Sequence, residues 1–170
     1  MRRHIFAGIV ITLLAIVESS LLPAALGNTL RPNLVLLVSA TWVALRGNEG
    51  FFWATGGGLL LDLQSGAPFG MHMVGLIVGN LLATLLDRAP IPIISILRSL
   101  NWVFVTTVAY YATTLVVLAF AGRTFEISIG FTNVVLPSLI ANLILTIPVH
   151  IVLTQLQARL REQERFLPER

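Results

Sequence analysis

Six long apolar stretches run along the chain, and short segments containing glycine, proline or charge separate them. A helix that crosses a bilayer needs about 20 apolar residues, and a backbone in lipid must satisfy its own hydrogen bonds. The pattern therefore predicts an all-α polytopic membrane protein, with six transmembrane helices in a compact bundle over residues 1–154. Five spans are the alternative, if residues 33–66 form one bent unit. The predicted spans cover residues 5–26, 33–46, 50–66, 69–86, 97–121 and 133–154.

The composition supports a membrane protein and excludes other classes. Of the 170 residues, 56% are hydrophobic and 11% are charged, whereas a soluble domain carries about 25% charged residues. So few charges cannot cover a surface that faces water. The chain contains no cysteine, which excludes a disulfide framework and a thiolate metal site.

The arginines indicate how the spans are oriented. Cytoplasmic segments of membrane proteins carry an excess of positive charge, so we predict that both termini are cytoplasmic. The net charge of +3 then reflects topology rather than a nucleic-acid partner. Trp42, Trp53 and Trp102 are expected near the inner headgroups, as membrane anchors. Nine arginines fall in inner segments (Arg2, Arg3, Arg46, Arg88, Arg98, Arg159, Arg161, Arg165, Arg170) and two in outer segments (Arg31, Arg123).

Small residues concentrate in the third and fourth spans. Helices in lipid associate through close backbone packing, for which glycine leaves room. These positions are therefore predicted to pack against a neighbouring helix or to receive the helix of a partner. Gly66 and Gly70 flank Pro68 and predict a tight turn between the two spans. The small residues predicted to take part in packing or docking are Gly56, Gly57, Gly58, Gly66, Gly70, Gly75, Gly79 and Ala83.

Two carboxylates lie inside predicted spans, where an ionised group is costly. Asp62 has two interpretations: it accepts hydrogen bonds from the Gly66–Gly70 turn or pairs with a cation, or it is a proton or ion site. Glu18 is expected to pair with Arg31 or Arg123, or to reach the headgroups. We find no HExxH, GxSxG or P-loop motif, so the sequence predicts neither an enzyme nor a cofactor.

The last stretch, residues 155–170, reads as a cytoplasmic amphipathic tail. Leucines recur on one helical face, and arginines and glutamates occupy the rest. The tail either lies along the inner headgroups or docks onto a cytoplasmic partner. The residues predicted to make that contact are Leu156, Leu160, Arg161 and Arg165.

Residues 31–86 run from Arg31 and Pro32 through Gly47, Gly50 and Gly58 to Asp62, Gly66 and Gly70. This order of features resembles that of the bacterial rod shape-determining MreD family. Members of that family typically show an Arg/Pro-led apolar segment, a glycine-marked loop, a Gly-x-x-Gly-Leu-Leu-x-Asp-like segment and a glycine turn. The resemblance covers about a third of the chain, and beyond residue 90 only hydropathy supports it. Gly56 and Gly57 stand where the family has bulkier apolar residues. The matching positions are Arg31, Pro32, Gly47, Gly50, Gly58, Leu59, Leu60, Asp62, Gly66 and Gly70.

This resemblance implies a role and a set of partners. The family belongs to the cell-elongation (rod) complex of the bacterial inner membrane, which maintains cell shape and directs peptidoglycan synthesis. The implied partners are MreC, a single-span protein, the MreB filament and a glycosyltransferase–transpeptidase pair. The implied fold is similar to the substrate-binding subunits of energy-coupling-factor transporters. In this interpretation, spans three and four, around Gly58, Gly75 and Gly79, form either the bundle core or the face that receives MreC.

Two other functions fit the same pattern. The first is a vitamin-binding subunit of an energy-coupling-factor transporter, which requires an outward pocket with convergent polar groups. The second is a proton-coupled transporter or channel that uses Glu18 and Asp62. The outer polar residues available to a vitamin site are Glu18, Arg31, Asp62, His72, Arg123 and Glu126.

Overall fold

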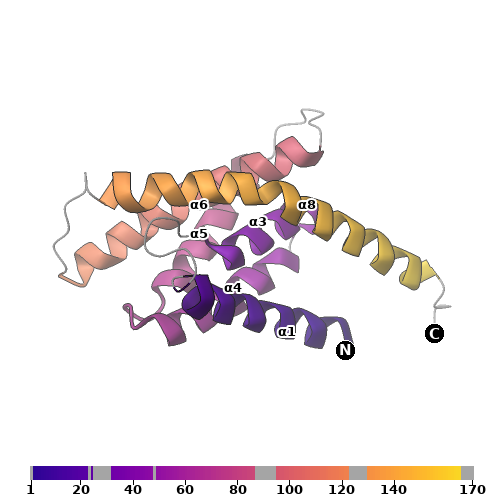
Figure 1. Cartoon of the computed structure of the whole chain (residues 1–170), viewed down its shortest axis with the longest axis horizontal. Coiled ribbons are helices and arrows are strands. Elements are labelled where there is room, and N and C mark those ends of the chain that lie inside the picture. The colour runs from indigo at the N-terminus through magenta and orange to yellow at the C-terminus, as the bar shows by residue number, and fades with distance from the viewer. Residues whose placement is uncertain are drawn as a thin grey trace.

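The computed structural model describes six helical segments and, within the described residues, no strand (Figure 1). It describes residues 2–22, 24, 32–47, 49–86, 95–122 and 130–165, with backbone only for 2–7, 49 and 160–165. The segments are α1 (Arg2–Ile16) with its π-helical continuation η1 (Val17–Leu21), α3 (Leu34–Arg46), α4 (Glu49–Ser65), α5 (Met71–Leu86), α6 (Ser95–Phe120), and the π-helical turn η2 (Phe131–Val135) that continues into α8 (Leu136–Arg165).

The six described helical segments lie over the six apolar stretches of the sequence. Most bounds agree to within a few residues, and the main difference is that α8 continues to Arg165 instead of ending near residue 154. Residues 33–66 form two helices rather than one bent unit. By length and composition, two of the described helices, Ser95–Phe120 and Phe131–Arg159, could cross a membrane.

Local sequence signals explain where the central helices begin and end. Asn33 precedes α3, and its side-chain oxygen accepts a hydrogen bond from the N–H of Leu36 at 2.7 Å, as an N-cap does. Gly47 ends α3 with a φ of 68°, and its N–H donates to the carbonyl of Val43 at 2.7 Å. A left-handed backbone at this position suits glycine because other side chains are strained there.

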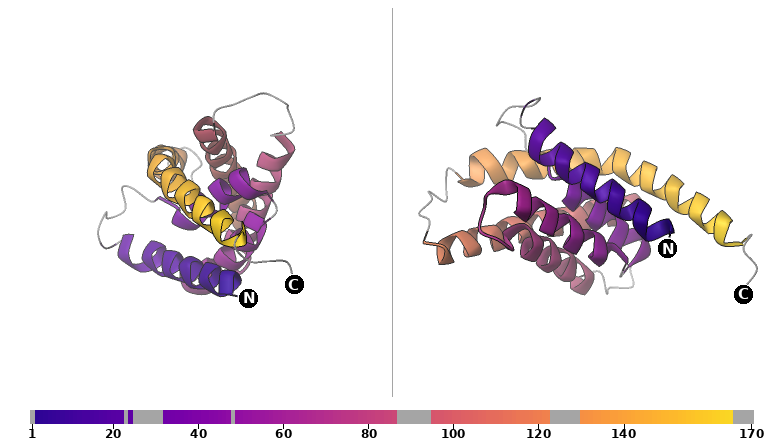
Figure 2. Two further views of the ribbon diagram at one scale, coloured as in Figure 1. Left: turned by 90° about the vertical axis from the view of Figure 1, so that its right-hand side faces the viewer. Right: turned by 90° about the horizontal axis from the view of Figure 1, so that it is seen from below.

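Helix α3 lies at the centre of the bundle. All residues from Val35 to Ala44 are buried, because α3 contacts α1, α4, α5, α6 and α8. Figures 1 and 2 show the other helices arranged around it. With 13 residues, α3 is about 20 Å long at a rise of 1.5 Å per residue.

The bundle has two chemically different ends. The "carboxylate end" is the end at which Glu18, Asn33, Asp62 and His72 lie, where α3 and α5 begin. The "arginine end" is the end at which Arg46 and Arg98 lie, where α3 ends and α6 begins. The end of α8 also reaches this side, because the side-chain amide of Gln157 donates to the carbonyl of Leu45 at 3.5 Å.

The tryptophans at the arginine end are packed inside the protein. Trp42 is 2% exposed and Trp102 is 3% exposed, and Trp42 stacks on Trp53 with 5.2 Å between ring centroids. The expectation that Trp42 and Trp102 anchor the chain at a membrane surface is therefore wrong. Their rings fill the core between helices instead.

Candidate functional site

Asp62 joins α4 to the beginning of α5. One carboxylate oxygen accepts a hydrogen bond from the backbone N–H of His72 at 2.8 Å, and the other accepts from the N–H of Met73 at 3.1 Å. The side chain is 4% exposed. The first N–H groups of a helix have no partner within the helix, and the helix dipole favours a negative charge there. Asp62 therefore acts as a cap from a neighbouring helix, two residues beyond the turn where its partners were expected.

Glu18 makes the equivalent contact at the beginning of α3. Its carboxylate accepts a hydrogen bond from the backbone N–H of Val35 at 3.0 Å. The predicted partners Arg31 and Arg123 lie outside the described residues. The two short helices of the bundle, α3 and α5, thus each begin against a carboxylate that the preceding helix supplies.

Further hydrogen bonds link these two caps into a circuit. The imidazole Nδ1 of His72 contacts the hydroxyl of Tyr110 on α6. The side-chain oxygen of Asn142 on α8 accepts from the N–H of Asn33 at 2.9 Å, and its amide donates to the hydroxyl of Thr107 on α6 at 3.2 Å.

A last contact closes the circuit on the far side. The hydroxyl of Ser19 donates to the side-chain oxygen of Gln64 at 2.6 Å, which joins η1 to α4. These separate contacts, which the backbones of the helices connect to one another, therefore join all six helical segments described in one closed order. We call this set the polar ring. Its members are Glu18, Ser19, Asn33, Asp62, Gln64, His72, Thr107, Tyr110 and Asn142.

The chemistry of the polar ring favours structural linkage over proton transfer. Asp62 contacts the backbone N–H of His72, not its imidazole, and an amide proton is not passed on at neutral pH. Both Asp62 oxygens already accept hydrogen bonds from a helix terminus. The arrangement can hold helices at fixed positions, since a buried polar group that loses its partner is costly.

The small residues of α5 face α6 and not an open surface. A Cβ at Gly75 would lie 2.8 Å from a ring carbon of Tyr110, and one at Gly79 would lie 2.8 Å from the carbonyl oxygen of Thr106. Ala83 is buried in a cluster with Trp102. This glycine face is therefore filled by the chain's own α6, which rules it out as the surface that receives a partner helix.

The glycines of α4 pack on two sides. A Cβ at Gly57 would meet the side chain of Val35 on α3, and one at Gly58 would lie 2.5 Å from the Cα of Met73 on α5. Nothing lies within 4 Å of a Cβ built at Gly56. The prediction that Gly56 belongs to the packing face is wrong, because successive residues point about 100° apart around a helix.

Gly66 and Gly70 have a conformational role. Their φ angles are 62° and 90°, and a Cβ at either position would meet nothing within 4 Å. They serve the turn between α4 and α5 and not helix packing. Any other residue would be strained there.

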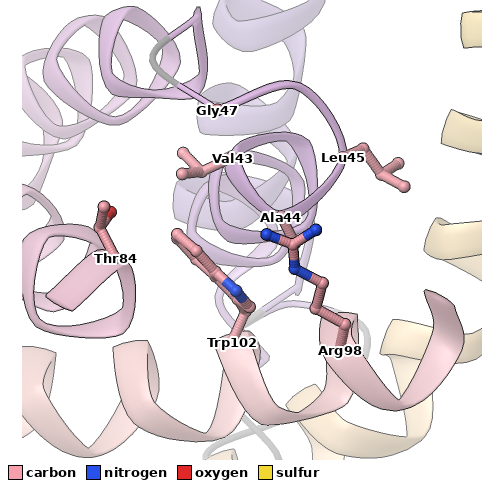
Figure 3. A pocket seen from close by; sticks show the side chains of 7 residues that line it. All are labelled: Val43, Ala44, Leu45, Gly47, Thr84, Arg98 and Trp102. Carbon is pink, nitrogen blue, oxygen red and sulfur yellow. The ribbon is translucent and has the colours of Figure 1, made fainter. Parts of the chain in front are cut away.

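The structure has a pocket at the arginine end, away from the polar ring. Its volume is about 290 Å³, close to the lower limit of about 300 Å³ for small-molecule sites. Figure 3 shows the guanidinium of Arg98 extending toward Ala44 at the end of α3, beside the indole of Trp102. The alternative vitamin-binding function would place its site at the other end, around Glu18, Asp62 and His72. The pocket is lined by Val43, Ala44, Leu45, Gly47, Thr84, Arg98 and Trp102.

The predicted tail residues differ in their placement. Leu156, predicted to contact a cytoplasmic partner, packs against the cluster of Val38, Trp42 and Leu153. The backbone of residues 155–165 continues α8 without a break. The side chains of Leu160, Arg161 and Arg165 lie outside the described residues, as does Glu126.

Five members of the polar ring did not follow from the sequence. Asn33 could have been found, because Asn between a proline and an apolar run is typical of an N-cap. Ser19, Gln64, Thr107 and Tyr110 carry no such signal, since each depends on a residue at least 35 positions away.

Comparison of the chain with models of protein families, with curated proteins and with solved structures finds no match.

Proposed function

We propose that this chain is a non-catalytic integral membrane scaffold of the bacterial cell-elongation complex, of the MreD type. The observation that carries the proposal is the polar ring. A transporter or enzyme needs polar groups that face a substrate, whereas here the carboxylates within the apolar segments hold helices together. Such a bundle is suited to presenting a rigid outer surface to partner proteins.

The exposed surface of the described helices supports residence in lipid. Large apolar side chains such as Phe104, Val108, Ile144 and Ile147 are exposed on α6 and α8. A water-soluble protein rarely exposes such a continuous apolar surface. With the arginine end in the cytoplasm, the order of the helices is consistent with the excess of arginine that is predicted for cytoplasmic segments.

The residues on which the MreD resemblance rests have identifiable structural roles. Gly47 ends α3 with a positive φ, and Gly50 lies against Val43 so closely that a side chain would not fit. Gly58 contacts the backbone of α5, and Asp62 caps that helix. The motif therefore specifies a three-helix framework, α3–α4–α5, which a family of scaffolds would retain.

The single span of MreC then has to pack on an outer face, because the glycine face is filled by α6. On α8, Ile140, Ile144, Ile147 and Ile151 are all exposed and follow the 4-3-4 spacing at which one helix packs along another. We place the MreC span on this isoleucine stripe. Its branched side chains lose little rotamer freedom on packing.

Co-purification in mild detergent tests this assignment. Replacing Ile144→Ala and Ile147→Ala together should strongly reduce the amount of MreC recovered and should round the cells. The matched control, Phe104→Ala with Val108→Ala, removes exposed apolar side chains from α6 and should leave both readouts unchanged. Equal recovery of MreC with both double variants would refute the stripe, and a stoichiometric vitamin in the purified protein would refute the scaffold.

A further inference from the structure

At the carboxylate end, the helices extend to different distances beyond the polar ring. Tyr110 contacts His72 at the beginning of α5, yet α6 continues for ten more residues to Phe120, which adds about 15 Å. Asn142 binds Asn33 just before α3, yet the η2–α8 segment begins eleven residues earlier, at Phe131. One side of the molecule, made of α6 and α8, therefore rises well above the polar ring.

On the two sides of the molecule, the exposed surface changes from apolar to polar at different distances from the polar ring. On the tall side, the large apolar side chains exposed above the ring are those of Val116, Phe120, Phe131 and Leu136, and the polar Thr132 and Asn133 are exposed among them. On the short side, α4 ends at the level of the ring, and its last residues, Gln64 and Ser65, are exposed and polar. An apolar surface that faces lipid should thus end near the ring on one side and up to about 15 Å farther along the helix axis on the other.

The lengths can be compared with a bilayer. The 16 residues of α5 span about 24 Å and the 26 residues of α6 about 39 Å, whereas the hydrocarbon core of a bilayer is about 30 Å thick. Lipid beside a helix shorter than the core thins to match it. Beside a longer helix, tilting absorbs the excess length.

From these lengths we infer that the chain makes the bilayer thinner on one side of the protein than on the other. We call this difference in bilayer thickness the step. Phospholipid headgroups and water descend to the level of the polar ring beside α4 and α5, whereas the bilayer keeps its full thickness beside α6 and α8. The partner of the short side is the phospholipid itself. The inference rests on the proposed location of the chain in a membrane, and it adds a shape that the scaffold imposes on the lipid.

Single cysteines provide the test, because the natural chain contains none. Phe69→Cys lies in the turn on the short side, where Phe69 is 69% exposed, and Val116→Cys lies on the tall side, where Val116 is 54% exposed. Val116 is six residues beyond Tyr110, so it lies about 9 Å beyond the ring along the axis of α6. Ile144→Cys, at an exposed position two residues beyond Asn142 toward the arginine end, reports whether the chain has inserted.

Each variant is reconstituted in vesicles of 18-carbon phosphatidylcholine and treated with a charged maleimide, and rates are normalised to those in detergent. The step predicts that Phe69→Cys reacts on the order of tenfold faster than Val116→Cys or more, because a charged reagent enters hydrocarbon only at a cost of several kcal/mol. In a flat bilayer the higher residue, Val116→Cys, would react at least as fast, which would overturn the step. Protection of both residues would overturn it equally.

The control separates failure of the step from failure of the proposed function. If Ile144→Cys reacts as fast in vesicles as in detergent, the chain has not inserted and the scaffold proposal fails as well. If Ile144→Cys is protected while Phe69→Cys and Val116→Cys react alike, only the step is wrong.

Discussion

At the scale of single residues, two carboxylates in apolar segments act as caps of helices to which they do not belong. Asp62 and Glu18 each accept backbone N–H groups at the beginning of a short helix. Hydrogen bonds and the helix dipole reduce the cost of placing a carboxylate there. Of the two interpretations that the sequence left open for Asp62, the geometry favours the structural one.

Substitution of Asp62 should reduce stability in proportion to the acceptors that are lost. Asp62→Ala removes both acceptors, and we expect the free energy of unfolding in detergent to fall by about 1–2 kcal/mol. Asp62→Asn keeps one oxygen and should lose less. Denaturant titration followed by circular dichroism measures both, and an ion site without a structural role would leave both variants as stable as the natural protein.

Gly79 on α5 and Gly56 on α4 should respond to alanine with opposite signs. At Gly79 the new Cβ would lie 2.8 Å from the Thr106 carbonyl, so Gly79→Ala should cost about 1–3 kcal/mol through overpacking. At Gly56 the Cβ meets nothing within 4 Å, so Gly56→Ala should stabilise the helix by about 0.5–1 kcal/mol. Thermal melts in detergent test the pair, and two shifts of the same sign would contradict the packing described.

At the scale of helices, the sequence predicts which helices are present and in what order better than it predicts which residues of different helices are in contact. Helix positions follow from runs of apolar residues, because hydropathy is a local property. Contacts depend on rotation about each helix axis, so Gly57 and Gly58 meet neighbours while Gly56 does not. For the same reason, the partners of Glu18 and Asp62 could not be chosen from the sequence, and Tyr110 was not recognised as a member of the ring.

Truncation should divide α8 into a part that supports the bundle and a part that does not. Removing residues 156–170 deletes Leu156, which packs near Trp42, and Gln157, which donates to Leu45. We expect this change to cost about 1–2 kcal/mol of stability. Removing only residues 160–170 should leave the melting temperature unchanged but weaken crosslinking to cytoplasmic elongation proteins. Equal melting temperatures for the two truncations would contradict the packing of Leu156.

At the scale of the whole molecule, the polar ring connects segments far apart in the sequence. Ser19 meets Gln64, and Asn33 meets Asn142, so both halves of the chain are needed to complete it. Because these contacts share the same helices, their contributions to stability are expected to be coupled rather than additive. The bundle should therefore unfold as one unit.

The location of the whole chain has a direct test. With so few charges and an exposed apolar surface on α6 and α8, the chain should remain in the membrane fraction after an alkaline wash and enter solution only with detergent. Membrane flotation with immunoblotting measures this. Recovery of folded monomer from the aqueous fraction would contradict both the membrane location and the proposed scaffold.

The enclosure of α3 also bears on how such a chain is made. Its residues from Val35 to Ala44 are all covered by neighbouring helices, and it is shorter than the roughly 30 Å of hydrocarbon that a lone helix would have to cross. If the chain is made in its proposed membrane location, α3 reaches the insertion machinery before its final neighbours α6 and α8 have been synthesised. We therefore expect the nascent segment to need a temporary companion, either α4 as a co-inserted hairpin or a chaperone of the insertion channel, until the later helices arrive.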